Sequence, residues 1–234
     1  MIKTSIIIPI YKEFHNIEKL YLKIRKYLKG NIYEVIFVDD SSNDGTEELL
    51  KKIKKRYKNF NFIIRKKNRD LSQSCFDGIK KAKYDYIQIM DGDLQHNPRY
   101  IPKLIDTLIK NNSDLVVGGR NLINGKNPGL GQIRRISSIL IIFTFYLLGK
   151  KTIDPMSGFF LFKKKIYFKN KKYFFGKGYK ILADILFNSK SKIKVNDYII
   201  VFDRRFKDKS KMNFKTLFNL IKLYFYILKN KIFN

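Results

Sequence analysis

The sequence predicts a single α/β domain built on a mostly parallel central sheet flanked by helices. Two observations support this. Over the first 118 residues, short β-branched apolar runs alternate with longer amphipathic stretches. Polar clusters then follow several of the apolar runs at the points where strands would end. Strict alternation of strand and helix is typical of a parallel sheet covered by helices, and such sheets bind ligands at the carboxyl ends of their strands.

The expected strands are short and apolar, whereas the expected helices carry an apolar stripe. The first strand contains Pro9, and the helix after it places Ile17, Leu20, Ile24 and Leu28 on one face. Glycine and asparagine at 30 and 31 end that helix. We expect strands at residues 5–10, 33–38, 60–65, 84–90 and 115–118, and helices at 15–30, 47–57, 71–83 and 98–110.

Composition places the chain among folded globular proteins. Its 234 residues are 44% hydrophobic and 15% aromatic, which excludes a disordered segment. The one cysteine, Cys75, excludes a disulfide framework and a cysteine-based zinc site, and it fits a reducing compartment.

The formal net charge is +29, from 49 basic and 20 acidic residues. Nucleic acid, an anionic membrane surface and compositional drift towards lysine are the three competing explanations. The sequence carries no nucleic-acid-binding signature beyond charge, so we expect no nucleic-acid partner. We favour a membrane surface because apolar helices accompany the lysines.

Two stretches have the composition of helices at a membrane surface. Residues 136–149 form the longest run without charge, too short to span a bilayer easily. In residues 213–233, Lys215, Lys222 and Lys229 recur every seven residues and lie near one helical face. The alternative for each stretch is packing against the domain. Because the N-terminus has no cleavage-type signal, we expect a cytoplasmic protein peripherally associated with the membrane.

Three polar clusters fall where strands should end: Tyr11 with Glu13, Asp39 with Asp40, and Asp91 with Asp93. Carboxylates at such a rim suit a hard divalent cation, which in turn suits a diphosphate. For Asp40 we favour ligand binding over capping of the next helix, and for Asp44 we favour capping. Glu13 either contacts the ligand or stabilises a helix N-terminus.

Eight ordered motifs resemble glycosyltransferase family 2, which has the GT-A nucleotide-diphospho-sugar transferase fold. The longer signature is similar to the dolichol-phosphate mannosyltransferases, the polyprenyl-phosphate hexose synthases. Together the motifs cover roughly residues 3–212 and are specific as a set, whereas each alone is not. They are 9–13 (PIYKE), 38–46 (VDDSSNDGT), 90–98 (MDGDLQHNP), 118–121 (GGRN), 134–138 (RRISS), 154–159 (DPMSGF), 178–186 (GYKILADIL) and 202–211 (FDRRFKDKSK).

The resemblance implies an inverting, metal-dependent transfer of a hexose, with GDP-mannose the favoured donor, onto a polyprenyl or dolichyl phosphate. It implies a GT-A-like catalytic domain over residues 1–212, and the pattern of lysines and apolar residues described above predicts an amphipathic membrane-surface helix over residues 213–234. Mg²⁺ or Mn²⁺ would be held by Asp93, the Gln95 carbonyl and Asp91, and the acceptor phosphate by Arg120, Arg134 and Ser138. Catalysis is assigned to Asp91, Asp93, Arg120 and Arg134. The donor-binding residues would be Pro9, Tyr11, Glu13, Asp40, Asp91, Lys180, Arg205 and Lys211.

The chain departs from the family pattern at several positions. Asp208 stands in place of glycine, Asp184 in place of glutamate and Gly119 in place of serine, and residues 68–72 (NRDLS) replace a glycine-rich turn. Several structural alternatives stay open: Lys180 and Asp184 as a surface ion pair, solvated arginines at 134 and 205, and His96 in a loop hydrogen bond rather than on the metal.

Two other functions remain open at this point. One is a family 2 enzyme that adds a sugar to a glycan hydroxyl, for which Asp184 would be the base. The other is a non-catalytic basic module that binds membranes or nucleic acid.

Overall fold

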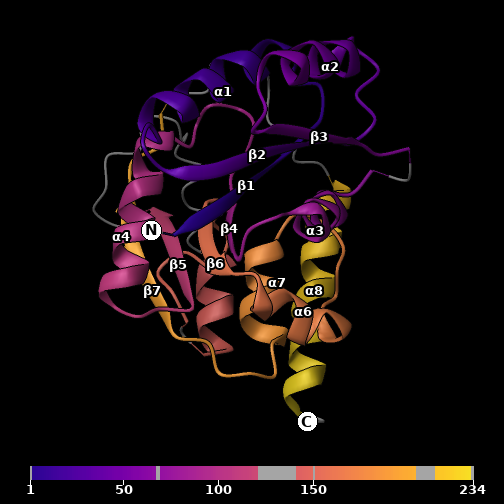
Figure 1. Ribbon diagram of the computed structural model, residues 1–234. Coiled ribbons are helices and arrows are strands. Elements are labelled where there is room, and N and C mark those ends of the chain that lie inside the picture. The colour runs from indigo at the N-terminus through magenta and orange to yellow at the C-terminus, as the bar shows by residue number, and fades with distance from the viewer. Residues whose placement is uncertain (1, 67–68, 121–140, 150, 204–213, 233–234) are drawn as a thin grey trace.

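The computed structural model describes residues 2–66, 69–120, 141–149, 151–203 and 214–232. Within them a seven-stranded sheet runs in the order β3-β2-β1-β4-β6-β5-β7 (Figure 1). The strands are β1 (Lys3–Ile10), β2 (Ile32–Asp39), β3 (Phe60–Ile64), β4 (Tyr86–Ile89), β5 (Leu115–Arg120), β6 (Phe160–Lys163) and β7 (Val195–Ile200). β6 pairs antiparallel with β4 and β5, and the other strand pairs are parallel. The predicted mostly parallel α/β sheet is therefore confirmed.

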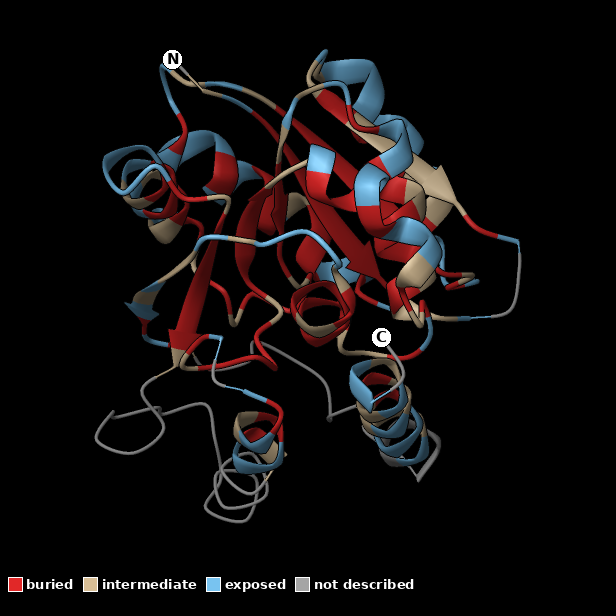
Figure 2. Ribbon diagram, turned by 90° about the horizontal axis from the view of Figure 1, so that it is seen from below, coloured by how far each residue is buried: buried red, intermediate tan, exposed pale blue. Residues whose placement is uncertain are grey.

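Helices cover both faces of the sheet. Alternate residues along each strand point to opposite faces, and two separate clusters of buried side chains result. The first cluster joins the sheet to α1 (Phe14–Tyr27), α2 (Thr46–Arg56) and α4 (Ile101–Lys110), and α4 is preceded by the 3-10 turn η1 (Pro98–Tyr100). The second joins it to α3 (Leu71–Lys81), α6 (Lys165–Asn170) and α7 (Ile181–Asn188), with the 3-10 turn η2 (Lys171–Tyr173) after α6. Figure 2 shows the buried strands between helices whose outer sides are exposed.

The strand and helix expectations hold for the first half of the chain, with small shifts at the ends. The fourth strand is shorter than expected because Tyr84, Asp85 and Met90 lie outside it. The fifth is longer, ending at Arg120 instead of Gly118. The expected helix 98–110 divides into η1 and α4. No periodic pattern in the sequence predicted the antiparallel strand β6, whose four residues are apolar except for the last.

The C-terminal helix α8 (Phe214–Ile232) packs against the domain along one side and is exposed along the other. Leu223 and Ile227 are buried in a third cluster with Ile142 and Phe145 of the helical residues 141–147 and with Ala183 of α7. Packing against the domain is therefore realised along one side of this helix, and contact of its exposed side with a membrane stays a prediction. No helix in the described part of the chain is long and apolar enough to cross a bilayer.

Candidate active site

A cavity of about 550 Å³ lies where β1, β2, β4, β5 and β7 reach their carboxyl ends. This is the rim at which the sequence placed its three polar clusters, and each cluster contributes at least one residue to the lining. Eight of the predicted site residues meet there: Pro9, Tyr11, Glu13, Asp40, Asp91, Asp93, Arg120 and Lys180. The described residues that complete the lining are Ile10, Arg69, Leu71, Ser74, Ile89, Gly92, His96, Met156, Ser157, Gly158, Tyr179, Ile181 and Phe202.

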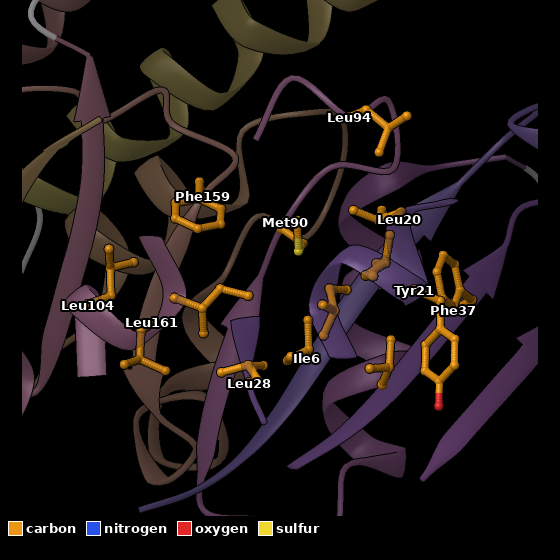
Figure 3. Packing of buried hydrophobic residues seen from close by; sticks show 14 of the residues in the cluster. Ile6, Leu20, Tyr21, Leu28, Phe37, Met90, Leu94, Leu104, Phe159 and Leu161 are labelled. Carbon is orange, nitrogen blue, oxygen red and sulfur yellow. The ribbon is translucent and has the colours of Figure 1, made fainter. Parts of the chain in front are cut away.

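The loop carrying Asp91 and Asp93 is anchored in the hydrophobic core on both sides. Met90 precedes the two aspartates and Leu94 follows them, and both pack in the cluster that contains Leu20 of α1 (Figure 3). Leu94 adopts a φ of 64°, in the left-handed region that a leucine rarely occupies. Such a conformation costs roughly 1–3 kcal/mol and persists only where the surroundings fix it. Burial of Leu94 fixes it here, and the two carboxylates are presented to the cavity.

His96 stabilises the same loop from beneath. Its Nδ1 accepts a hydrogen bond from the backbone N–H of Asp91 at 3.1 Å, and its ring packs against those of Phe159 and Phe202. Because Nδ1 is an acceptor here, the proton of the neutral ring is on Nε2. This is the loop hydrogen bond that the sequence favoured over metal ligation.

The space above Asp91 is kept open by a glycine. A Cβ added at Gly158 would lie 2.8 Å from Oδ2 and 2.9 Å from Oδ1 of Asp91, closer than a carbon can approach. This leaves room beside the Asp91 carboxylate. The carboxylates of Asp91 and Asp93 offer oxygen ligands of the kind that Mg²⁺ and Mn²⁺ prefer. Among the described residues, no group of three or more His, Cys, Asp or Glu side chains is arranged to hold a metal ion.

Gln95 lies one residue beyond Leu94 and is not part of the cavity lining. Its backbone N–H donates to Oδ1 of Asp93 at 3.1 Å, and its backbone carbonyl accepts from the N–H of Asp203 at 3.0 Å. The backbone of Gln95 thus positions Asp93, and a metal contact through a Gln95 carbonyl oxygen stays a prediction.

Arg120 enters the cavity from the end of β5 and is fixed by a carboxylate that the sequence analysis did not assign to the site. Its Nε donates to Oδ2 of Asp154 at 2.7 Å and its Nη2 to Oδ1 at 3.2 Å. Asp154 is fully buried, and the guanidinium also lies 5.2 Å from the ring centre of Phe202. Two parallel hydrogen bonds of this kind fix both the position and the plane of a guanidinium.

The serine-to-glycine departure at position 119 has a local explanation. A Cβ at Gly119 would lie 2.7 Å from Cγ1 of Ile153, in the residue before Asp154. In this chain Ile153 occupies the volume that a side chain at 119 would need.

Lys180 is the second cation of the cavity. It precedes α7, and its Nζ donates to the backbone carbonyl of Met156 at 3.3 Å. Burial and the nearby charge of Arg120 lower the pKa of Lys180, while Asp154 and Asp91 oppose that shift. The cavity therefore contains the cations Lys180 and Arg120 together with the carboxylates of Asp91 and Asp93.

Asp40 lines the cavity but is engaged with protein groups. Its Oδ1 forms a buried ion pair with Arg65, and its Oδ2 accepts the backbone N–H of Asp70 at 2.8 Å. Burial raises the pKa of Asp40, and Arg65 opposes the shift. Asp39 is buried and accepts from the backbone N–H and hydroxyl of Ser42. The cap residue of α2 is Gly45, without a side-chain cap, and Asp44, one residue earlier, accepts the Thr46 N–H at 3.2 Å.

Tyr11 and Arg69 form a stacked pair at the outer wall of the cavity. The Arg69 guanidinium carbon lies 4.1 Å from the centre of the Tyr11 ring. Glu13, on the same side, accepts from Asn16 Nδ2 at 2.6 Å, so its carboxylate both lines the cavity and braces the start of α1.

Neither role that the sequence suggested for Asp184, a base for a hydroxyl acceptor or a surface ion pair with Lys180, agrees with its position. This residue is buried inside α7 and does not line the cavity, so it is not placed to act as a base for a hydroxyl acceptor. It is also not the surface partner of Lys180. Its carboxylate accepts from the backbone N–H groups of Phe175 and Gly176 at 2.9 and 2.7 Å and from Asn188 Nδ2 at 2.8 Å.

Sequence reasoning missed other cavity residues as well. Arg69 belongs to a segment noted for its departure from the family pattern, and Tyr179 and Phe202 lie inside motifs that were noted as whole units. The signal was therefore present, but motif matching does not say which residue of a motif faces the ligand. Arg134, Ser138, Arg205, Lys211 and Asp208 lie outside the described residues.

Comparison with known proteins agrees with this arrangement. A profile described as glycosyl transferase family 2 matches residues 5–169. The chain belongs to this family. The match includes all three strand-end clusters together with Arg120 and Asp154, and it confirms the family resemblance found in the sequence.

Curated members of the family named dolichol-phosphate mannosyltransferase are similar over most of the chain. That of Pyrococcus furiosus is 35% identical over 230 residues, which are 97% of this chain and 64% of the relative. That of Saccharomyces cerevisiae is 33% identical over 198 residues, 79% of this chain and 70% of the relative. The chain thus spans a little less than two thirds of the length of the Pyrococcus protein.

Solved structures show the same fold at low sequence identity. Glucosyl-3-phosphoglycerate synthase from Mycobacterium tuberculosis, in complex with phosphoglyceric acid, superposes with a TM-score of 0.71 at 16% identity, covering 97% of this chain and 79% of that one. The same enzyme in complex with Mn²⁺, uridine diphosphate and glucosyl-3-phosphoglycerate gives a TM-score of 0.69 at 17% identity, with coverage of 97% and 79%. The GT-A fold predicted from the sequence is confirmed.

Proposed function

We propose that this chain transfers a hexose from a nucleotide diphosphate sugar to a polyprenyl or dolichyl phosphate, with GDP-mannose as the favoured donor. The observation that carries the proposal is the pairing of opposite charges in one cavity. Asp91 and Asp93 line it from the end of β4, and Arg120, fixed by Asp154, lines it from the end of β5. One side suits a metal-bound diphosphate and the other suits a second phosphate. The printed names of the Pyrococcus and Saccharomyces relatives support the same assignment.

The donor would lie along the first half of the sheet rim. Tyr11 with Arg69, together with Pro9 and Asp40, would frame the nucleoside, and Lys180 would contact the diphosphate. Asp91 and Asp93 would hold Mg²⁺ or Mn²⁺ against that diphosphate, and a Mn²⁺ complex of a structural neighbour supports a divalent cation. When bound, the cation neutralises charge on the leaving nucleoside diphosphate.

The acceptor chemistry suits the residues that are present. The second proton of a phosphate monoester is lost near pH ~6, so its oxygen is an anionic nucleophile at neutral pH without a base. That oxygen would attack the sugar C1 as the bond from C1 to the diphosphate oxygen breaks, and the leaving group departs with the electron pair. Configuration at C1 inverts. Arg120 offsets the repulsion between the two phosphates, and Arg134 and Ser138 are proposed to assist it.

A hydroxyl acceptor is less consistent with the structure. Such an acceptor needs a base to remove its proton, and the sequence candidate for that base, Asp184, is buried away from the cavity with its carboxylate occupied by three hydrogen-bond donors.

Contact with a membrane surface is part of the proposal. The helical residues 141–147 expose Phe143 and Leu147, and α8 exposes Phe218 and Phe225 beside Lys222. Large apolar side chains next to lysines suit the boundary between headgroups and acyl chains of an anionic bilayer. A lipid phosphate acceptor would reach the cavity from such a surface, and we propose peripheral association with the cytoplasmic face.

One assay tests the proposed function. The purified chain is incubated with vesicles containing a polyprenyl phosphate, with Mg²⁺ or Mn²⁺ and with GDP-mannose, UDP-glucose or UDP-N-acetylglucosamine, and products are followed by mass. We expect a lipid-linked hexose, strongest with GDP-mannose, and its loss in Asp93→Asn and Arg120→Ala. Asp106→Asn, on the far side of α4, is the matched control. Transfer to a free glycan with no lipid-linked product would overturn the proposal.

A further inference from the structure

The turn at residues 175–178, which precedes α7, is held by side chains from two different helices. On one side the Asp184 carboxylate accepts the N–H groups of Phe175 and Gly176. On the other side the Asp70 carboxylate accepts the N–H of Gly178 at 2.8 Å. Only Lys177 of this turn is exposed, and the two carboxylates hold backbone that leads into Lys180.

The first turn of α3 supplies further contacts to the same backbone. Ser72 donates to the carbonyl of Gly178 through both its backbone N–H and its hydroxyl, each at 3.0 Å. Gln73 Nε2 donates to the carbonyl of Gly176 at 2.6 Å. Residues more than 100 positions apart in sequence are thereby joined at the edge of the cavity.

The turn can adopt its course because of two glycines. Gly176 and Gly178 have φ values of +68° and +89°, which glycine alone occupies without a steric penalty. The chain then passes directly into Tyr179 and Lys180, both of which line the cavity. The position of Gly178 therefore sets where the Lys180 ammonium lies.

Asp70 also contacts the opposite wall of the cavity. Its backbone N–H donates to Oδ2 of Asp40 at 2.8 Å, and its carbonyl accepts from Arg65 Nη1 at 3.3 Å. Its second carboxylate oxygen accepts the N–H of Gln73 at 3.1 Å and caps α3. One residue thus links the end of β2, the start of α3 and the turn before Lys180.

We propose that Asp70 is a positioning residue of the donor site: by holding Gly178 it fixes Lys180 against the donor diphosphate. The proposal rests on the assignment of Lys180 to the donor under the proposed function. Asp70 lies in the segment where this chain departs from a glycine-rich turn, and its carboxylate accepts a hydrogen bond from Gly178 that a glycine, which has no side chain, could not accept.

Substitution can separate the roles of the two carboxylate oxygens of Asp70. Serine caps a helix about as well as aspartate, but its single short hydroxyl cannot also reach Gly178. Asparagine keeps one accepting oxygen and places an NH₂ group where the second oxygen stood, so it must lose one of the two N–H partners. In Asp70→Ser the α3 cap is therefore retained while the contact with Gly178 is lost, and in Asp70→Asn one of the two contacts is lost.

The matched control is Asp114→Asn. Asp114 also receives two donors distant in sequence, Lys163 Nζ at 2.9 Å and the Lys194 N–H at 3.1 Å. It immediately precedes β5, at the end of that strand opposite Arg120 and the cavity. A loss of stability without any effect on the donor site is expected there.

The experiment measures binding of GDP with Mn²⁺ by calorimetry, the melting temperature, and transfer kinetics at varied donor concentration. Asp70→Ser should weaken GDP binding and raise KM for the donor about tenfold, the effect of losing one charge-assisted hydrogen bond. Asp114→Asn should lower the melting temperature at unchanged GDP affinity. In a Lys180→Ala background, Asp70→Ser should weaken GDP binding less than twofold further, because its effect passes through Lys180.

Equal GDP affinity in Asp70→Ser and in the unaltered chain would overturn the proposal, as would full additivity of the two substitutions. Failure of the donor assignment on which this rests looks different: the unaltered chain itself would then bind neither GDP nor UDP with Mn²⁺. Failure of the proposed acceptor would leave GDP binding intact and abolish only the lipid-linked product.

Discussion

The guanidinium of Arg120 and the carboxylate of Asp154 form a buried pair with two side-chain hydrogen bonds, at 2.7 and 3.2 Å. Asp154 has no exposed surface, and the Arg120 side chain is only 11% exposed. Asp154 therefore takes no part in contacting a ligand. It orients the one described arginine that the proposed mechanism assigns to the acceptor phosphate.

Replacing Asp154 by asparagine should impair transfer more than it impairs donor binding. The variant leaves the Arg120 charge without its anion, which costs about 3–5 kcal/mol of stability for a buried pair. Displacement of the guanidinium by about 1 Å is expected to lower kcat about 100-fold. Rates and GDP affinity are measured below the melting transition.

The control for this variant is Asp197→Asn, which leaves one oxygen to accept from both the Thr152 hydroxyl and the Ile153 N–H in the same loop. If both variants lowered kcat equally, Asp154 would act through loop stability and not through Arg120.

Gly158→Ala should weaken metal-dependent donor binding. The added methyl would lie 2.8 Å from Oδ2 of Asp91, so either the carboxylate or the chain must move. We expect the affinity for GDP with Mn²⁺ to fall about tenfold or more, with little change in the metal-free affinity. Calorimetry with and without Mn²⁺ separates the two. In an Asp91→Ala background the same substitution should have little further effect, and a full effect there would contradict this account.

The sequence predicted the site residues at the strand ends better than the residues that hold the cavity wall in place. Pro9, Tyr11, Glu13, Asp40, Asp91 and Asp93 directly follow or end apolar strands, so a local pattern locates them, and parallel strands bring them together. Asp154 and Asp70 act through partners 34 and 108 positions away in sequence, and no periodicity reports such pairs.

Asp184 shows the opposite error. Its position four residues after Lys180 on an expected helix suggested a surface pair, because i,i+4 spacing is the usual geometry of such pairs. In the structure that face of the helix is buried. A buried carboxylate needs hydrogen-bond donors, and Asp184 accepts from the N–H groups of Phe175 and Gly176.

Exposed apolar residues of α8 should govern membrane association. Phe218 and Phe225 are 56% and 61% exposed, and burying them in a bilayer interface is favourable by roughly 1–3 kcal/mol each. The double variant Phe218→Ser with Phe225→Ser should lower flotation with anionic vesicles at least about tenfold, without loss of GDP binding.

The matched control is Ile109→Ser with Ile199→Ser, on α4 and β7, which lie across the molecule from α8 (Figure 1). Both isoleucines are 57% exposed. If the control variant lost flotation to the same extent, general hydrophobicity and not α8 would explain binding. Unchanged flotation of the α8 variant would likewise contradict the prediction.

Donor affinity should fall as the pH rises, and the fall should begin at a pH below the ordinary lysine pKa of about 10.4. Burial and the charge of Arg120 lower the pKa of Lys180, so in the donor-free chain this ammonium loses its proton earlier than other lysines. The neutral amine binds a diphosphate less well. The folded chain then holds fewer protons than the unfolded chain between the lowered pKa and 10.4, so the contribution of Lys180 to stability rises with pH across that window. Lys180 therefore links weaker donor binding to greater stability as the pH rises.

Titration of GDP binding and of melting temperature from pH 7 to about 10, the upper end set by the ordinary lysine pKa, checks both trends against two variants. In Lys180→Arg the charge persists across this range, and the decline in affinity should disappear. In Lys180→Met affinity should be low and independent of pH. A decline of the same steepness in all three proteins would assign it to another group, and the role of Lys180 at the donor would fall with it.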